Sequence, residues 1–294
     1  MIPPALRVLA RVAPVVLVSL LCASVEADAG EILIKSGEKV SFLGDSITAQ
    51  GWGNPAGYVK LIVAGLAANG VDIDVAPAGI GGHKSNDMLA RLERDVLSKK
   101  PQWMTLSCGV NDVWHGDKGV PLDDAQAAAQ TYVKRSPGEP DKGTFKKNIA
   151  QIVEQAQAAG VKVVILTATV IHEDLKSPEN AKLAPYNDFL RQLAREKGLP
   201  LADLNAIFQE KIKVANQPGK NVFTMDGVHM NTEGNKVMAI GVLQAVGLDL
   251  EQITKAQMAW KPMEAEAVEE AKKVAAAKVA AEKAAAEKGA AATK

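Results

Sequence analysis

Residues 144–170 read TFKKNIAQIVEQAQAAGVKVVILTATV, and this stretch decides the fold class. In its first half, apolar residues from Ile149 to Ala156 recur at the spacing of one helical face, and Gly160 is a typical helix stop. Its second half, residues 161–170, is a long apolar run rich in β-branched side chains, as expected for a strand buried on both faces of a parallel sheet. An amphipathic helix followed directly by a buried strand indicates an α/β protein.

The same alternation continues on both sides of this stretch. We expect strands at residues 39–43, 71–75, 103–107, 161–170 and 199–204. We expect helices at residues 58–68, 85–97, 144–159, 182–197 and 232–246. Strands that alternate with helices predict an α/β sandwich with a mostly parallel sheet, in which ligands bind at the carboxyl ends of the strands. The loops after residues 43, 75, 107 and 170 are therefore the places to look for chemistry.

The composition excludes several classes of protein. The 294 residues carry 34 basic and 34 acidic side chains, so the chain lacks the basic excess of a general nucleic-acid binder. Hydrophobic residues make up 47% and charged residues 23%, which are ordinary values for a soluble globular protein. Two cysteines do not make a disulfide scaffold.

The first 27 residues have the layout of a secretory signal peptide. Arg7 and Arg11 precede the mostly apolar residues 12–23, and Val25-Glu26-Ala27 fits a small-x-Ala cleavage site. The apolar run is shorter than the ~20 residues that span a bilayer, although an uncleaved anchor is the alternative. Lipidation at Cys22 is disfavoured because Leu21 stands where a small residue is expected. We expect an exported protein, periplasmic or secreted, without a membrane span after cleavage.

The C-terminal residues 256–294 differ in composition from the rest. From Lys261 onward Ala, Lys and Glu dominate, without an aromatic residue, and these are strong helix formers. The three valines of this segment do not form a heptad seam. We expect a solvated tail, helical or disordered, after a main domain at residues 28–255. A spacer or docking helix is the alternative.

The first strand is followed by Gly44-Asp45-Ser46-Ile47-Thr48. A serine hydroxyl next to a strand end can act as a nucleophile when a base lies nearby. Taken alone, these five residues are equally compatible with a turn and a helix cap.

Two further loops offer hydrogen-bond donors. Residues 76–85, APAGIGGHKS, lack the glycines of a phosphate loop and of a dinucleotide fingerprint, which leaves an oxyanion donor at Gly79 or a flexible turn. In Cys108-Gly109-Val110-Asn111-Asp112, the amide of Asn111 can donate to an oxyanion, although an ordinary Asn-Asp turn is the alternative.

The segment Asp226-Gly227-Val228-His229 precedes the last expected helix. A carboxylate three residues before a histidine can orient the imidazole, and histidine is the natural base for a serine at neutral pH. A loop histidine on its own is more often structural or solvated.

In combination, these blocks resemble the SGNH (GDSL-type) hydrolases over residues 31–247. The order G-D-S-[IL], glycine, G-x-N-D, D-x-x-H is that of the family. The resemblance implies a flavodoxin-like three-layer α/β/α sandwich with a five-stranded sheet, and an ester hydrolase that needs no cofactor or metal. It implies Ser46 as nucleophile, His229 as base and Asp226 as its orienting acid. The backbone N–H groups of Ser46 and Gly79 and the amide of Asn111 would form the oxyanion hole. Pro77 stands where the family usually has Asn, which affects hydrogen bonding in that loop and not the N–H of Gly79.

The resemblance leaves the substrate open. Export and the absence of an evident apolar lid favour a substrate that carries short O-acetyl groups on extracellular carbohydrate. The expected binding partner is thus a small-molecule or polysaccharide ester. A lysophospholipase-like esterase, an inactive glycan-binding module and acyl transfer to a sugar are the alternatives. The long polar segment at residues 116–142 is expected to cover the site.

We expect the remaining reactive side chains to take no direct part in the chemistry. His83, His115 and His172 match no metal-ligand spacing, and we expect them, with Trp114, to line the pocket or to be exposed. Cys108 is expected to be a buried small hydrophobe. Asp45 is expected not to act as a base, and Asp112 is expected to tie down its loop.

Overall fold

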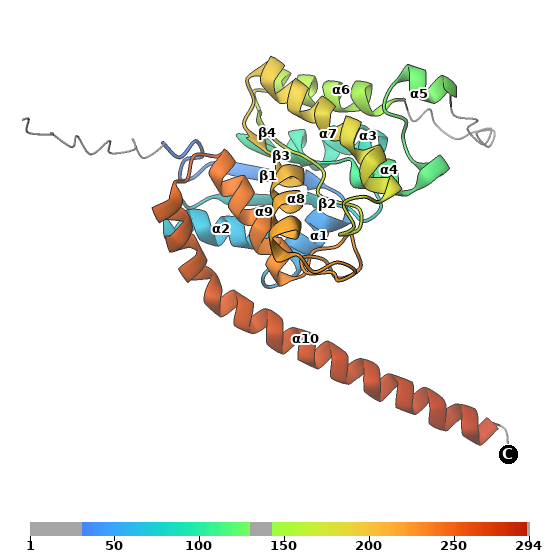
Figure 1. The fold of residues 1–294 in the computed structure, drawn as a ribbon. Helices are drawn as coiled ribbons and strands as arrows, with labels where there is room; N and C mark the ends of the chain where they lie inside the picture. Colours follow the sequence, from blue (N-terminus) through green and yellow to red (C-terminus); the bar gives the residue numbers. More distant parts are fainter. Residues whose placement is uncertain (1–30, 130–142, 293–294) are drawn as a thin grey trace, which may run out of the picture.

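The computed structural model describes residues 31–129 and 143–292. At its centre is a sheet of five parallel strands in the order β2-β1-β3-β4-β5 (Figure 1). The strands are β1 (Lys39–Gly44), β2 (Asp74–Gly79), β3 (Trp103–Ser107), β4 (Lys162–Leu166) and β5 (Leu201–Ala202). The predicted α/β class and parallel sheet are confirmed. The strand order reverses direction between β1 and β3, which is the place where doubly wound sheets bind ligands.

Helices cover both faces of the sheet (Figure 1). One layer holds α1 (Ser46–Gly53), α2 (Tyr58–Ala68), α8 (Leu204–Ala215) and α9 (Thr232–Ala245). The other holds α3 (Ser85–Asp95), α4 (Val110–Trp114), α6 (Phe145–Ala158) and α7 (Pro178–Lys197), with α5 (Asp124–Ala129) beside it. Short 3-10 turns occur at Leu97–Lys99 and Gly116–Lys118. Side-chain caps start several helices, because Thr144, Ser177 and Asp203 each accept a hydrogen bond from an N–H of the first turn.

Three strands differ from the expected bounds by more than one residue. The fifth, expected at residues 199–204, spans only Leu201–Ala202, because Asp203 already caps α8. The second strand begins at Asp74 because Val71 still donates its N–H to the carbonyl of Leu66 and closes α2. It continues to Gly79 through Pro77, which the edge position of β2 tolerates because one side of an edge strand has no ladder partner. The fourth strand ends at Leu166 rather than at residue 170, and the buried residues after it are held by other groups, such as the side chain of Asn187 on the backbone of Ala168.

The start of the last helix, α10 (Leu250–Ala292), belongs to the packed domain. Ala256 and Trp260 are fully buried against α2, and the indole Nε1 of Trp260 donates to the carbonyl of Leu61 at 2.8 Å. The packed part of the chain therefore extends past residue 255, where we expected the tail to begin. Residues 268–278 are exposed, and the helix runs away from the domain (Figure 1).

Some expectations fall on residues outside the described part of the chain. The predicted signal peptide at residues 1–27 lies there, as do residues 130–142 of the segment expected to cover the site. Within the described residues, no helix is both long enough and apolar enough to cross a membrane.

Candidate active site

The switch point lies between β1 and β3, and polar side chains follow both strands at the carboxyl edge of the sheet. β1 ends at Gly44, and the buried carboxylate of Asp45 then caps α1 by accepting the N–H of Ile47 at 2.9 Å. This cap places Ser46 at the first position of α1, where helix N–H groups lack intrahelical partners and the helix dipole is positive.

Ser46, His229 and Asp226 form one hydrogen-bonded chain. His229 Nε2 lies 2.8 Å from Ser46 Oγ, and His229 Nδ1 lies 2.7 Å from Asp226 Oδ2. A carboxylate at Nδ1 favours the tautomer that carries its proton there, which leaves Nε2 free to accept the hydroxyl proton of the serine. Ser46 and His229 are 183 positions apart in the sequence, and the fold brings them together.

The carboxylate of Asp226 is held in its charged form. Burial raises its pKa, but hydrogen bonds from the His229 ring and from the N–H groups of His229 and Val228 outweigh burial and hold the pKa below its usual value. Asp226 therefore remains an acceptor for the imidazole at neutral pH.

The loop that carries Asp226 and His229 is anchored by a residue that the sequence did not reveal. The carboxylate of Glu173 accepts the backbone N–H groups of residues 222, 223 and 224, and also the hydroxyl of Thr224. His172, next to it, donates its N–H to the carbonyl of Gly227 at 2.7 Å. Gly227 has a φ of +94°, and a Cβ on it would lie 2.5 Å from the His172 ring, so only glycine fits.

The two residues expected to complete an oxyanion hole lie on the neighbouring strands. Gly79 is the last residue of β2 rather than part of a loop, and a Cβ there would collide with the backbone of α1 at Ala49. The chain then passes the nucleophile candidate, because a Cβ on Gly81 would lie 3.9 Å from the Cβ of Ser46. The segment after β2 thus borders the serine.

Asn111 is buried in α4, after β3. Its amide nitrogen donates to Asp45 Oδ2 at 3.3 Å and to the carbonyl of His83 at 3.2 Å, and its amide oxygen faces His115 Nε2 at 3.1 Å. These contacts fix the orientation of the amide and direct its nitrogen towards the residue that precedes Ser46.

Two buried carboxyl groups hold the loops around these residues in place by hydrogen bonds. Burial raises the pKa of Asp45 to about 6 and that of Asp112 also to about 6. Asp112 accepts the hydroxyl and the N–H of Ser85, at 2.6 and 3.1 Å, and so joins the start of α3 to α4. It also accepts from the thiol of Cys108, whose burial raises its pKa well above the usual value. Asp112 ties down its loop as expected, and Cys108 is an inert buried thiol.

The four other candidate pocket residues lie in different surroundings. Trp114 is 38% exposed, and its ring centroid lies 6.4 Å from that of His229 and 5.9 Å from that of His115. His83 is half-buried and accepts from Arg91 through its ring, and His172 is exposed behind the Asp226 loop. Among the described residues, no group of three or more His, Cys, Asp or Glu side chains is placed to hold a metal ion.

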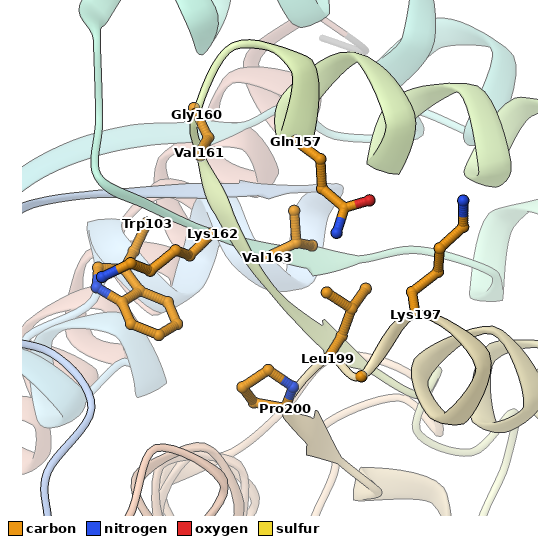
Figure 2. Close-up of a pocket in the computed structure, with 10 residues that line it drawn as sticks. Trp103, Gln157, Gly160, Val161, Lys162, Val163, Lys197, Leu199 and Pro200 are labelled. Atoms are coloured by element: carbon orange, nitrogen blue, oxygen red, sulfur yellow. The ribbon is translucent and has the colours of Figure 1, made fainter.

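A separate cavity of about 410 Å³ lies at the opposite, amino-terminal edge of the sheet (Figure 2). Figure 2 shows Lys162 beside the indole of Trp103, and its ammonium lies 4.9 Å from the ring centroid. Glu38 accepts from Trp103 Nε1 at 2.8 Å and lies 3.7 Å from Lys162. Lys162 of this cavity is thus paired with a neighbouring carboxylate.

The family of the chain follows from comparison with known proteins. The sequence profile of the GDSL-like Lipase/Acylhydrolase family matches residues 42–237, which contain Ser46, Asn111 and the Asp226–His229 loop. The chain belongs to this family. The predicted SGNH (GDSL-type) resemblance is thereby confirmed, and the protein is a carboxylic ester hydrolase.

Several relatives and solved structures that this chain matches over nearly their whole length are named acetylxylan esterases. The acetylxylan esterase of Geobacillus stearothermophilus is 27% identical over 235 residues, which span 74% of this chain and 97% of that protein. The crystal structure of Axe2, an acetylxylan esterase from the same organism, aligns with a TM-score of 0.59 at 26% identity, over 74% of this chain and 97% of that one. The acetyl xylan esterase AlAXEase aligns with a TM-score of 0.57 at 32% identity, over 71% and 99% of the two chains.

Proposed function

We propose that this GDSL hydrolase removes O-acetyl groups from carbohydrate through a covalent acyl-enzyme formed on Ser46. The observation that carries the mechanism is the chain of hydrogen bonds from Asp226 through His229 to Ser46, at 2.7 and 2.8 Å. The observation that supports the substrate class is the set of relatives named acetylxylan esterases, which this chain matches over nearly their whole length.

In the first half of the reaction, the oxygen of Ser46 bonds to the acetyl carbonyl carbon while His229 Nε2 takes the hydroxyl proton. Asp226 stabilises the imidazolium that forms and keeps its orientation. When the tetrahedral intermediate collapses, the bond between the carbonyl carbon and the sugar oxygen breaks, and His229 gives its proton to that oxygen. In the second half, His229 takes a proton from water as the water oxygen bonds to the carbonyl carbon of the acetyl-serine. The bond between that carbon and Ser46 Oγ then breaks, His229 returns the proton to Oγ, and acetate and free Ser46 result.

We assign the stabilisation of the negative charge on the carbonyl oxygen to three hydrogen-bond donors. They are the N–H of Ser46 at the start of α1, the N–H of Gly79 at the end of β2 and the amide of Asn111. Two contacts support this assignment: Gly79 packs on the backbone of α1, and Gly81 borders Ser46. Asn111 is held beside Asp45, and its amide nitrogen would exchange one of its two hydrogen bonds, to Asp45 or to the carbonyl of His83, for the oxyanion. Fixed donors that face the developing charge are the usual source of most of the rate enhancement.

The test is the release of acetate from acetylated xylo-oligosaccharides, together with hydrolysis of p-nitrophenyl esters from acetate to decanoate, by wild type and Ser46→Ala. We expect acetate release that disappears in the variant, and ester activity that falls steeply beyond butyrate. Higher activity on decanoate than on acetate would overturn the acetyl specificity in favour of a lysophospholipase-like esterase. A folded wild type that turns over none of these esters would instead indicate a glycan-binding module.

Export is the second part of this proposal. It is supported by the sequence of residues 1–27 and by substrates that occur outside the cell. N-terminal sequencing of the exported protein is expected to begin at Asp28. A protein that retains residues 1–27 would contradict cleavage.

A further inference from the structure

The short helix α4 and its C-cap carry three side chains on one face, and one of them contacts the catalytic histidine. Asn111, Trp114 and His115 stand at positions i, i+3 and i+4, which are neighbours on a helix surface. His115 Nε2 contacts the amide oxygen of Asn111 at 3.1 Å, and the ring of Trp114 lies beside those of His115 and His229. One turn of helix therefore carries both the oxyanion amide and an aromatic ring.

The indole of Trp114 is unusual for this helix because it faces solvent. Residues 110–113 are buried, whereas Trp114 is 38% exposed. Its ring meets that of His229 at 68°, an edge contact and not a stack of two faces, and part of the indole stays open to solvent. It is the position of this ring beside the reactive histidine, and not its exposure alone, that points to a binding role.

A second exposed apolar side chain lies in the loop of the catalytic histidine. Met225 is 58% exposed, precedes Asp226 and donates its N–H to the carbonyl of His229 at 2.8 Å. Trp114 thus places apolar surface beside the catalytic histidine, and Met225 adds exposed apolar surface in the loop that carries it. A polar acetyl group does not need such an area, but the C–H face of a sugar ring does.

We propose that Trp114 is the sugar-binding platform of this enzyme, on which the pyranose ring that carries the acetyl group packs. This inference rests on the proposed function and assigns its carbohydrate subsite. The C–H bonds on one face of a pyranose carry slight positive charge and match the negative face of an aromatic ring. Because Trp114 and Asn111 share one helical turn, a sugar on the indole brings its ester towards the oxyanion donors and Ser46.

The experiment compares kcat/KM on acetylated xylo-oligosaccharides with kcat/KM on p-nitrophenyl acetate, for Trp114→Ala, Trp114→Leu and Trp114→Phe. We expect the ratio of glycan to aryl acetate activity to fall by about tenfold or more in the Ala and Leu variants, mainly through a higher KM on the glycan. Phe keeps an aromatic face, so it should retain most of the wild-type ratio. Leu keeps apolar bulk at the end of α4 and is the second variant should Ala unfold the helix.

Trp52 provides the matched control. It is 37% exposed, almost the same as Trp114, but it lies near the end of α1 rather than beside His229. Trp52→Ala should leave the activity ratio as in the wild type.

Two results would overturn the platform. Equal losses on both substrates in the Trp114 variants would mean that the indole only supports His229. Unchanged glycan activity would mean that sugars do not contact it. Failure of the proposed function is distinguishable from both, because the wild type itself would then release no acetate from the oligosaccharide while it still cleaves p-nitrophenyl acetate.

Discussion

The two edges of the sheet carry very different polar groups. At the carboxyl edge, Ser46, His229 and Asp226 form a chain that can pass a proton. At the amino edge, the cavity of Figure 2 holds Lys162 and Lys197, but Lys162 lies against Trp103 and Glu38, and Lys197 lies 3.6 Å from Glu154. Both lysines of this cavity are thus paired with carboxylates. Reactive potential in this fold therefore follows the ends of the strands and the switch in their order, and not the presence of a hollow.

The cause of the difference is local geometry. At the carboxyl edge the two strands that flank the switch point lead within a few residues into a helix N-terminus, from Gly44 to α1 and from Ser107 to α4. Helix N-termini offer unpaired N–H groups and positive potential. The amino edge receives helix C-termini instead, and residues such as Gly160 and Gly198 close them with positive φ angles.

The largest expected difference between the edges concerns Ser46. Ser46→Ala should lower kcat on p-nitrophenyl acetate by about 10⁶, the loss seen when the nucleophile of a serine triad is removed. Ser98, which lies before β3 near the other edge and donates to the carbonyl of Arg94, is the matched control. Ser98→Ala should keep wild-type kcat. Equal activity in the two variants would remove the distinction between the edges.

A smaller effect is expected for Asn111, the proposed oxyanion donor. Asn111→Ala should lower kcat by about 10² to 10³ with little change in KM, because one donor to the transition state is lost. Gln157, which lines the cavity of Figure 2, offers a control. An Asn111→Ala enzyme as active as Gln157→Ala would show that the amide does not face the oxyanion.

The edges should also differ in the pH dependence of stability. Burial raises the pKa of Asp112 to about 6 from 3.8, so its contribution to the free energy of unfolding is present below pH 4 and is lost as pH rises through 6. Asp112→Asn keeps an acceptor for Ser85 and should abolish a loss on the order of 2–3 kcal/mol between pH 4 and 7. Urea denaturation at both pH values measures this difference.

Asp95, at the end of α3, should behave in the opposite sense. Hydrogen bonds from Arg94, opposed in part by burial and aided by Arg91, hold its pKa at about 2. Its contribution is present above pH 4 and is lost only as pH falls through 2, so Asp95→Asn should leave the pH 4 to 7 profile as in the wild type. Parallel profiles for wild type and Asp112→Asn would contradict the assignment of the buried acid.

The smallest effect is expected in the cavity of Figure 2. Lys162→Met should change the free energy of unfolding by less than about 1 kcal/mol, because the ammonium is largely exposed and its contacts with Trp103 and Glu38 are worth little in water. Activity on both aryl and glycan acetates should stay at the wild-type level. A tenfold loss of activity would mean that this cavity takes part in substrate binding.

Much of the fold could be predicted from the sequence because its signals are local. The spacing of apolar residues in α6 and the β-branched run of β4 each reflect which faces are buried. The start of β2 could not be predicted, since it depends on how Val71 closes α2. The packing of α10 past residue 255 was missed because the burial of Trp260 depends on contacts with α2 and α9, which are distant in sequence and form only in the folded chain.

The candidate site was predictable to the extent that its residues stand in recognisable blocks. Ser46, Asn111 and the Asp226–His229 pair each follow a strand or precede a helix, and the fold brings them to one edge. Glu173 carried no signal, because a lone acidic residue in a loop reveals its role only when three N–H groups point at it. The orientation of Asn111 by His115 was equally hidden, since it depends on the helical turn of α4.

The most direct test of the central claim is covalent labelling with a fluorophosphonate, followed by peptide mapping. We predict that the wild type gains one label on the peptide that contains Ser46, and that His229→Ala is labelled far more slowly because its serine lacks a base. A label on any other residue, or a folded wild type that takes no label, would contradict the assignment of the nucleophile to the carboxyl edge of the sheet.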